Sequence, residues 1–123
     1  MPYSATHLET APERAAIDHS QGPVLLEFGT PWCGHCARAQ PLIAAALATH
    51  PGVLHLKVED GPGKRLGRSF GVKLWPTLVF LKDGAEVARQ VRPHDGAAIE
   101  EALAFIEDQS SSSAGKPGNS TSV

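Results

Sequence analysis

The chain has 123 residues, a formal net charge of −2, 41% hydrophobic residues and 20% charged residues. This length accommodates one domain with its own core, burying roughly two thirds of the unfolded chain's surface. The nearly balanced charge and the lack of a long apolar run give no case for a nucleic-acid-binding or membrane-embedded protein. Residues 1–20 contain charged side chains and no signal-peptide core, so we expect a cytoplasmic protein.

The end of the chain differs in composition from the rest. From Gln109 onward the sequence turns to Ser, Gly, Asn and Pro with almost no large apolar side chain. Such a segment buries too little apolar surface to offset the entropy lost on ordering. We therefore expect a domain over residues 1–108 and a disordered tail over residues 109–123.

The first half of the chain predicts two helices and a buried strand. Thr10, followed by Pro12 and Glu13, is typical of a helix start with Thr10 as N-cap, and this helix should end near residue 18. The apolar run over 24–28 predicts a strand buried on both faces. A helix rich in Ala and Leu should follow over 33–49, kinked at Pro41 because proline lacks an N–H.

The second half predicts alternating strands and helices that end in a hairpin and an amphipathic helix. Asp95 can cap that last helix, whose apolar stripe Ile99, Leu103 and Ile106 should face the core and which should end near residue 107. The elements expected before it are a strand over 53–58, a short helix over 64–70, and a β-hairpin formed by strands over 77–81 and 85–91.

The only two cysteines, Cys33 and Cys36, lie two positions apart where the first strand runs into a helix. At a helix start the sulfur of Cys33 faces unpaired backbone N–H groups and the positive end of the helix dipole, which stabilise a thiolate. Cys36 lies one turn further on the same face, within reach of a disulfide. The pattern predicts a redox-active pair in which Cys33 attacks and Cys36 resolves the mixed disulfide.

The cysteines could alternatively serve a zinc site or a purely structural disulfide. A structural zinc site usually needs four Cys or His ligands, and the chain has no second Cys-x-x-Cys or His-x3-His pair to complete the set that Cys33 and Cys36 would begin. A purely structural disulfide is disfavoured because so short a loop restricts the unfolded chain little. We expect no bound metal.

The chain resembles the thioredoxin family over about residues 3–108. The resemblance rests on the order of the elements and on three stretches, namely Phe28 through Cys36, Pro41, and Phe70-Gly71-Val72 leading into Trp75-Pro76-Thr77. It implies an α/β thioredoxin fold with a central mixed β-sheet flanked by helices on both faces. It also implies a monomeric thiol-disulfide oxidoreductase that reduces protein disulfides with electrons from a separate reductase and without a cofactor.

Two alternative functions remain open. The motif around His35 looks most like the catalytic domains of protein disulfide isomerases, since small bacterial thioredoxins usually carry proline there. The reduction potential of the active-site disulfide is about −270 mV in thioredoxin and about −180 mV in protein disulfide isomerase. We expect the potential of this chain to lie between them or towards the isomerase. It could therefore be an oxidase or isomerase. The other alternative is a thioredoxin-fold binding module without turnover, which the intact Cys33 and Cys36 argue against.

A carboxyl, Glu27, interrupts the buried strand before the cysteines. Burial disfavours the charged form, so we expect its pKa to be raised. The resemblance implies that Glu27 lies beneath the disulfide and moves protons to and from the buried cysteine, with Lys57 as its neighbour. His55, two residues earlier on the same strand face, is the second choice of partner. The alternative role of Glu27 is a structural carboxylate paired with lysine.

The remaining site residues concern the motif and the substrate groove. His35 can favour the Cys33 thiolate when protonated, although it could also be an uninvolved exposed residue. The resemblance makes Pro76 a cis-proline that offers backbone hydrogen bonds to an extended substrate. It places the other groove residues at Trp32, Gly34, Trp75 and Arg92. Arg92 stands where most thioredoxins have glycine, and Trp75 is bulkier than usual.

Overall fold

The computed structural model describes residues 3–112, with side chains described up to residue 107. The elements follow one another in the expected order of strands and helices, after a first short helix. They are α1 (Arg14–Asp18), β1 (Pro23–Gly29), α2 (Gly34–Ala48), β2 (Leu54–Glu59), α3 (Arg65–Ser69), β3 (Thr77–Lys82), β4 (Ala85–Val91) and α4 (Gly96–Ser112).

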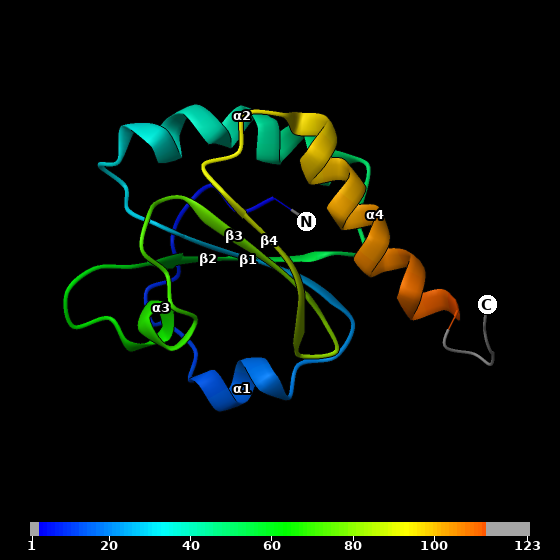
Figure 1. Cartoon of the computed structure of the whole chain (residues 1–123), viewed down its shortest axis with the longest axis horizontal. Helices are drawn as coiled ribbons and strands as arrows, with labels where there is room; N and C mark the ends of the chain where they lie inside the picture. Colours follow the sequence, from blue (N-terminus) through cyan, green and yellow to red (C-terminus); the bar gives the residue numbers. More distant parts are fainter. Residues whose placement is uncertain (1–2, 113–123) are drawn as a thin grey trace.

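The four strands form one mixed sheet in the order β2-β1-β3-β4. Strand β1 is parallel to β2 and antiparallel to β3, and β3 pairs with β4 as an antiparallel hairpin. Figure 1 shows α2 and α4 on one face of this sheet and α1 and α3 on the other. The expected α/β architecture, with helices on both faces of a mixed sheet, is confirmed.

Two apolar clusters cover the two faces of the sheet, as the continuous apolar run of β1 predicts. Leu25 of β1 packs with α2 and α4, whose stripe Ile99, Leu103 and Ile106 is fully buried. Leu26 and Phe28 pack on the other face with α1 and α3. Because side chains alternate along a strand, Glu27 faces α2 together with Leu25.

The start of α1 differs from the prediction. The helix begins at Arg14 with Glu13 at the N-cap position, without a side-chain cap, and Thr10 lies outside it. A cap at Thr10 would require Ala11 in helical conformation, and a residue that precedes proline disfavours that conformation. The cap at Asp95 is confirmed, since its Oδ1 accepts a hydrogen bond from the Ala97 N–H at 2.9 Å.

The region expected to be a disordered tail, residues 109–123, begins within α4. This helix continues to Ser112, so the first residues of the region expected to be disordered are helical. The rest of that region, residues 113–123, lies outside the described residues. Pro41 lies inside α2, where the carbonyl of Ala37 consequently lacks the N–H of its usual helical partner.

Candidate active site

Cys33 occupies the N-cap of α2, as the sequence predicts. Its backbone is extended, with φ −88° and ψ 121°, and its Sγ accepts a hydrogen bond from the Cys36 N–H at 3.2 Å. Both residues are thiols, and Cys33 is half-buried whereas Cys36 is only 4% exposed. The sulfur that can meet a protein substrate is therefore Cys33.

The environment of Cys36 strongly favours the thiol over the thiolate. Burial, followed by the hydrogen bond with Cys33 and the nearby Cys33 and Glu27 charges, raises the pKa of Cys36 to about 12, against the opposing influence of the Thr30 backbone N–H. A thiol is a nucleophile only after it loses its proton. Cys36 consequently needs a proton acceptor close by before it can resolve a mixed disulfide.

The direct partner of Glu27 is His55. His55 Nε2 lies 2.8 Å from Glu27 Oε1, with 0% and 1% of the two side chains exposed. The expectation that Lys57 would be the partner is wrong for this contact, although Lys57 is the register neighbour of Glu27 across β1 and β2. The parallel register aligns His55 with Leu25, and its ring reaches along the same face to the carboxylate.

The expected rise in the pKa of Glu27 is also wrong. Burial is the largest influence and raises the pKa, but the hydrogen bonds from His55 and Gln40, together with the nearby charge of Lys57, hold it below its ordinary value. A carboxylate that accepts several hydrogen bonds is favoured over the neutral acid. Glu27 is therefore ionised at neutral pH.

Gln40, which sequence reasoning missed, connects the charged groups. Its Nε2 donates to Glu27 Oε2 at 2.9 Å and to the Cys36 carbonyl at 2.8 Å. Its Oε1 accepts from Lys57 Nζ at 2.8 Å and from the Tyr3 hydroxyl at 2.7 Å. All four hydrogen-bonding positions of this amide are used. Lys57 thus reaches Glu27 through the Gln40 amide.

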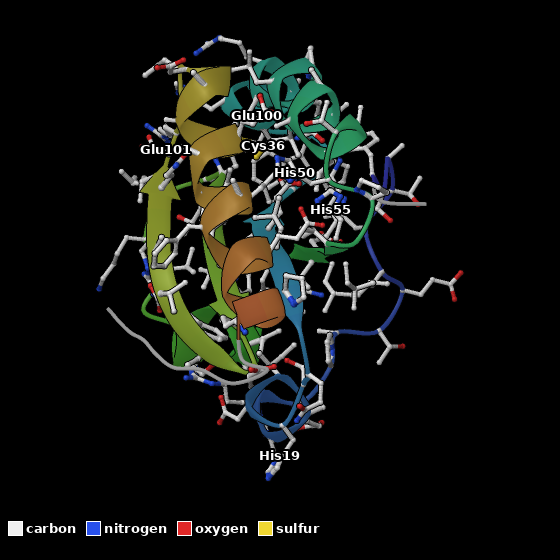
Figure 2. The ribbon with its side chains drawn as sticks, turned by 90° about the vertical axis from the view of Figure 1, so that its right-hand side faces the viewer. His19, Cys36, His50, His55, Glu100 and Glu101 are labelled. Atoms are coloured by element: carbon white, nitrogen blue, oxygen red, sulfur yellow. The ribbon has the colours of Figure 1, made fainter. Side chains whose placement is uncertain are left out.

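A cavity of about 450 Å³ opens beside the cysteines. Cys33, Cys36, Gln40 and Lys57 line it, and Glu27 does not. Figure 2 shows Cys36 and His55 on the side of the sheet that α2 covers. The two sulfurs therefore share one cavity with the amide of Gln40 and the ammonium group of Lys57.

His35 is exposed and lies between cationic groups. The charge of Arg92, then a partial loss of hydration and the charges of Arg38 and His94, lower the pKa of its imidazole. A lowered pKa leaves His35 mostly neutral at neutral pH, because its ordinary value is about 6.5. Its expected help to the Cys33 thiolate as a cation is correspondingly reduced.

The expected groove residues gather around the motif. The Trp32 and Trp75 rings meet edge to face at 5.6 Å between centroids, and Trp75 Nε1 donates to Asp60 Oδ2 at 2.8 Å. The Trp75-Pro76 peptide is cis. Arg92 has a positive φ of 51°, and its Nε donates to the Trp75 carbonyl at 2.8 Å. Trp32 is 73% exposed, so this surface is open to a partner.

Gly29 and Gly34 differ in what surrounds them. A Cβ at Gly29 would lie 2.6 Å from Cys36 Sγ, whereas a Cβ at Gly34 would meet nothing within 4 Å. Gly29 was not singled out from the sequence, although its place at the end of β1, just before the motif, is a usable signal. Gly29 leaves the space that the buried sulfur occupies.

Among the described residues, no group of three or more His, Cys, Asp or Glu side chains is arranged to hold a metal ion. Within the same range, no helix has the length and apolar character needed to cross a membrane.

Comparisons with known proteins identify the family. A family model described as thioredoxin matches residues 5–105. The chain is 40% identical to a thioredoxin of Chlamydia muridarum over 58% of this chain and 71% of that protein. It is 32% identical to protein disulfide isomerase-like 1-3 of rice over 89% of this chain, but spans only 19% of that relative. Reduced thioredoxin 2 of Pseudomonas aeruginosa has a TM-score of 0.77 and 55% identity, covering 87% of this chain and 99% of its own. This chain belongs to the thioredoxin family and is a thiol-disulfide oxidoreductase.

Proposed function

We propose that this protein reduces disulfides in other proteins. The Cys33 thiolate attacks one sulfur of the substrate disulfide, forms a mixed disulfide and releases the first substrate thiolate. Cys36 then loses its proton and attacks the Cys33 sulfur, which forms the Cys33–Cys36 disulfide and releases the second substrate thiolate. The substrate gains two electrons, and a separate reductase returns two electrons to the protein.

The contrast in exposure between the two sulfurs carries this proposal. Cys33 is half-buried at the start of α2, whereas Cys36 is 4% exposed and has a pKa of about 12. One sulfur is placed to meet a substrate, and the other is shielded until the mixed disulfide has formed. This asymmetry suits a substrate that is attacked once and then released.

Glu27 is proposed as the final acceptor of the Cys36 proton. It is ionised in the resting protein, so it can accept a proton at neutral pH. It does not line the cavity beside Cys36, and Gln40 bridges the two residues by donating to the Glu27 carboxylate and to the Cys36 carbonyl. The proton therefore passes through the cavity and then through the polar groups between that cavity and Glu27, rather than by direct contact.

The surface around Cys33 is proposed to receive an extended stretch of the substrate protein. Trp32 and Trp75 offer apolar contact, and Pro76, which follows Trp75 and precedes β3, is buried. Arg92 Nε donates to the Trp75 carbonyl, so a substrate N–H would share that oxygen with the guanidinium or displace it. We place the protein in the cytoplasm, as a monomer, where disulfides need repeated reduction.

The direction of electron flow has a second candidate. The motif with His35 and the 32% identity to a protein disulfide isomerase-like protein favour disulfide oxidation or isomerisation. Equilibration with glutathione measures the potential. A potential of about −270 mV supports reduction of substrate disulfides, and a potential of about −180 mV supports their formation or isomerisation.

The central experiment uses cysteine variants with a disulfide-bonded test protein. The wild-type protein should reduce the test protein with a chemical dithiol as electron source, and Cys33→Ser should abolish this reduction. Cys36→Ser should instead accumulate a mixed disulfide that a reductant releases. If the Cys33→Ser, Cys36→Ser double variant retains full cellular function, a binding module without turnover replaces this proposal.

A further inference from the structure

The N-terminal segment, residues 3–8, is seated on the groups that surround Glu27. The Ser4 N–H donates to His55 Nδ1 at 2.9 Å, and the Tyr3 ring stacks on the His55 ring at 5.5 Å with an interplanar angle of 24°. Lys57 Nζ donates to the Ala5 carbonyl at 3.0 Å. Together with the hydrogen bond from Tyr3 to Gln40, these contacts link the segment to each polar neighbour of Glu27.

The contact with Ser4 determines which nitrogen of His55 carries the proton. A backbone N–H can only donate, so Nδ1 must present its lone pair. In a neutral imidazole the proton then lies on Nε2, which is the nitrogen that faces Glu27 Oε1 at 2.8 Å. His55 is thereby held as a hydrogen-bond donor towards the carboxylate.

Both oxygens of Glu27 consequently face donors. Oε1 accepts from His55 Nε2, and Oε2 accepts from Gln40 Nε2. A neutral carboxyl accepts hydrogen bonds from these two donors more weakly than a carboxylate does. The arrangement therefore favours the ionised form of a side chain whose pKa burial alone would raise.

The other titratable groups near Glu27 come from three elements. Lys57 on β2 acts through the Gln40 amide, and Cys36 on α2 and the pair Tyr3 and His7 on the N-terminal segment feel the charge of Glu27. Unlike these groups, His55 contacts the Glu27 carboxylate directly. The N-terminal segment can therefore influence the ionisation of Glu27 through His55.

We propose that His55, held by Ser4 and Tyr3 of the N-terminal segment, is a positioning residue of the redox reaction that keeps Glu27 ionised and oriented behind Cys36. The proposal rests on the role of Glu27 as proton acceptor. It adds that the N-terminal segment, which is remote from the cysteines in sequence, keeps that acceptor ionised and in position. Loss of the contacts between the N-terminal segment and His55 should slow the attack by Cys36 and leave the attack by Cys33 unchanged.

The tautomer of His55 is tested first, with nitrogen-15 NMR of the full-length reduced protein. The wild-type spectrum should show Nε2 protonated and Nδ1 with a free lone pair. Ser4→Pro removes the backbone N–H and should shift the Nδ1 resonance of His55, because that lone pair loses its donor, whereas the matched control Ser4→Ala keeps the N–H and the wild-type resonance. A wild-type His55 protonated at Nδ1 would overturn the proposal without any variant.

The effect on Glu27 is tested with two replacements of His55. His55→Val removes the donor, and His55→Gln supplies an amide N–H in its place. In His55→Val, carbon-13 NMR should show the Glu27 carboxyl titrating roughly one pH unit or more higher, because burial is then less opposed. In His55→Gln, the titration should stay close to the wild-type curve. Equal titrations in His55→Val and wild type would overturn the proposal.

The kinetic consequence is measured in single turnovers with a disulfide peptide. Glu27 stays ionised at neutral pH in His55→Val but is no longer held in position, so the Cys36 step should slow about tenfold there and recover in His55→Gln. The attack by Cys33, measured in the Cys36→Ser background, should be unchanged in both. An unchanged Cys36 step in His55→Val overturns the positioning role if Glu27→Gln slows that step. If Glu27→Gln leaves the step unchanged, the acceptor role itself falls, and the carboxyl titration still decides whether His55 controls Glu27.

Discussion

At the scale of single residues, the two cysteines differ in what surrounds their sulfurs. Cys33 is half-buried at a helix start, whereas Cys36 is buried and has a pKa of about 12. We expect iodoacetamide at neutral pH to alkylate Cys33 first, by a factor of about 100 or more, because only a thiolate reacts. Mass spectrometry of the partly modified reduced protein gives the two rates. Equal rates would contradict the assignment of Cys33 as the attacking sulfur.

A second residue-scale prediction concerns Arg92 and His35. The Arg92 charge is the main cause of the lowered pKa of His35. Arg92 has a φ of 51°, which glycine adopts without strain. In Arg92→Gly the pKa of His35 should therefore rise towards its ordinary value, as followed by proton NMR of the ring. The matched variant Arg65→Gly changes a cation on α3 and should leave the His35 titration unchanged; an unchanged titration in Arg92→Gly would remove Arg92 from the surroundings of His35.

At the scale of elements, His50 fastens the end of α2 to α4. Its Nδ1 lies 2.7 Å from Glu107 Oε1, and its Nε2 lies 3.6 Å from Glu100 Oε2 (Figure 2). His50→Ala should lower the free energy of unfolding by about 1–2 kcal/mol, measured by urea denaturation. The control Glu101→Ala, on the exposed side of α4, should change it by less than about 0.5 kcal/mol. Equal effects would mean that this contact does not stabilise the helix pair.

The pairing of β1 with β2 predicts how stability depends on pH. The pKa of Glu27 is lowered in the folded protein, so its ionisation stabilises the fold above the unfolded-state value of about 4.5. That contribution should be lost as the pH falls through the lower folded-state pKa. Urea denaturation between neutral pH and about pH 3 should show a steeper loss of stability in wild type than in Glu27→Gln. Parallel curves would mean that the His55 and Gln40 contacts do not favour the carboxylate.

At the scale of the whole molecule, local sequence signals predicted the architecture, and long-range contacts decided the details of the site. The apolar run of β1 and the stripe of α4 specify buried faces by periodicity alone, so the sheet and its helix layers were predictable. The cysteine pair was predictable for the same reason, because Cys33 and Cys36 are neighbours on one helix.

The surroundings of Glu27 were not predictable in this way. The choice of His55 over Lys57 depends on Gln40 from α2 and on Ser4 from the N-terminal segment. These residues are distant in sequence, and no periodic pattern indicates that they meet. The direction of the Glu27 pKa follows from those hydrogen bonds, so the sequence alone favoured the opposite direction, in which burial dominates.

The most direct test of the proposed reaction is the rate of the Cys36 step in Glu27→Gln. Stopped-flow fluorescence of Trp32, which lies beside Cys33 in the motif, can follow formation and resolution of the mixed disulfide separately. If Glu27 accepts the Cys36 proton, Glu27→Gln should slow resolution by about tenfold or more and leave the initial attack by Cys33 unchanged. Resolution at the wild-type rate, or a slowing confined to the attack, would contradict that role for Glu27.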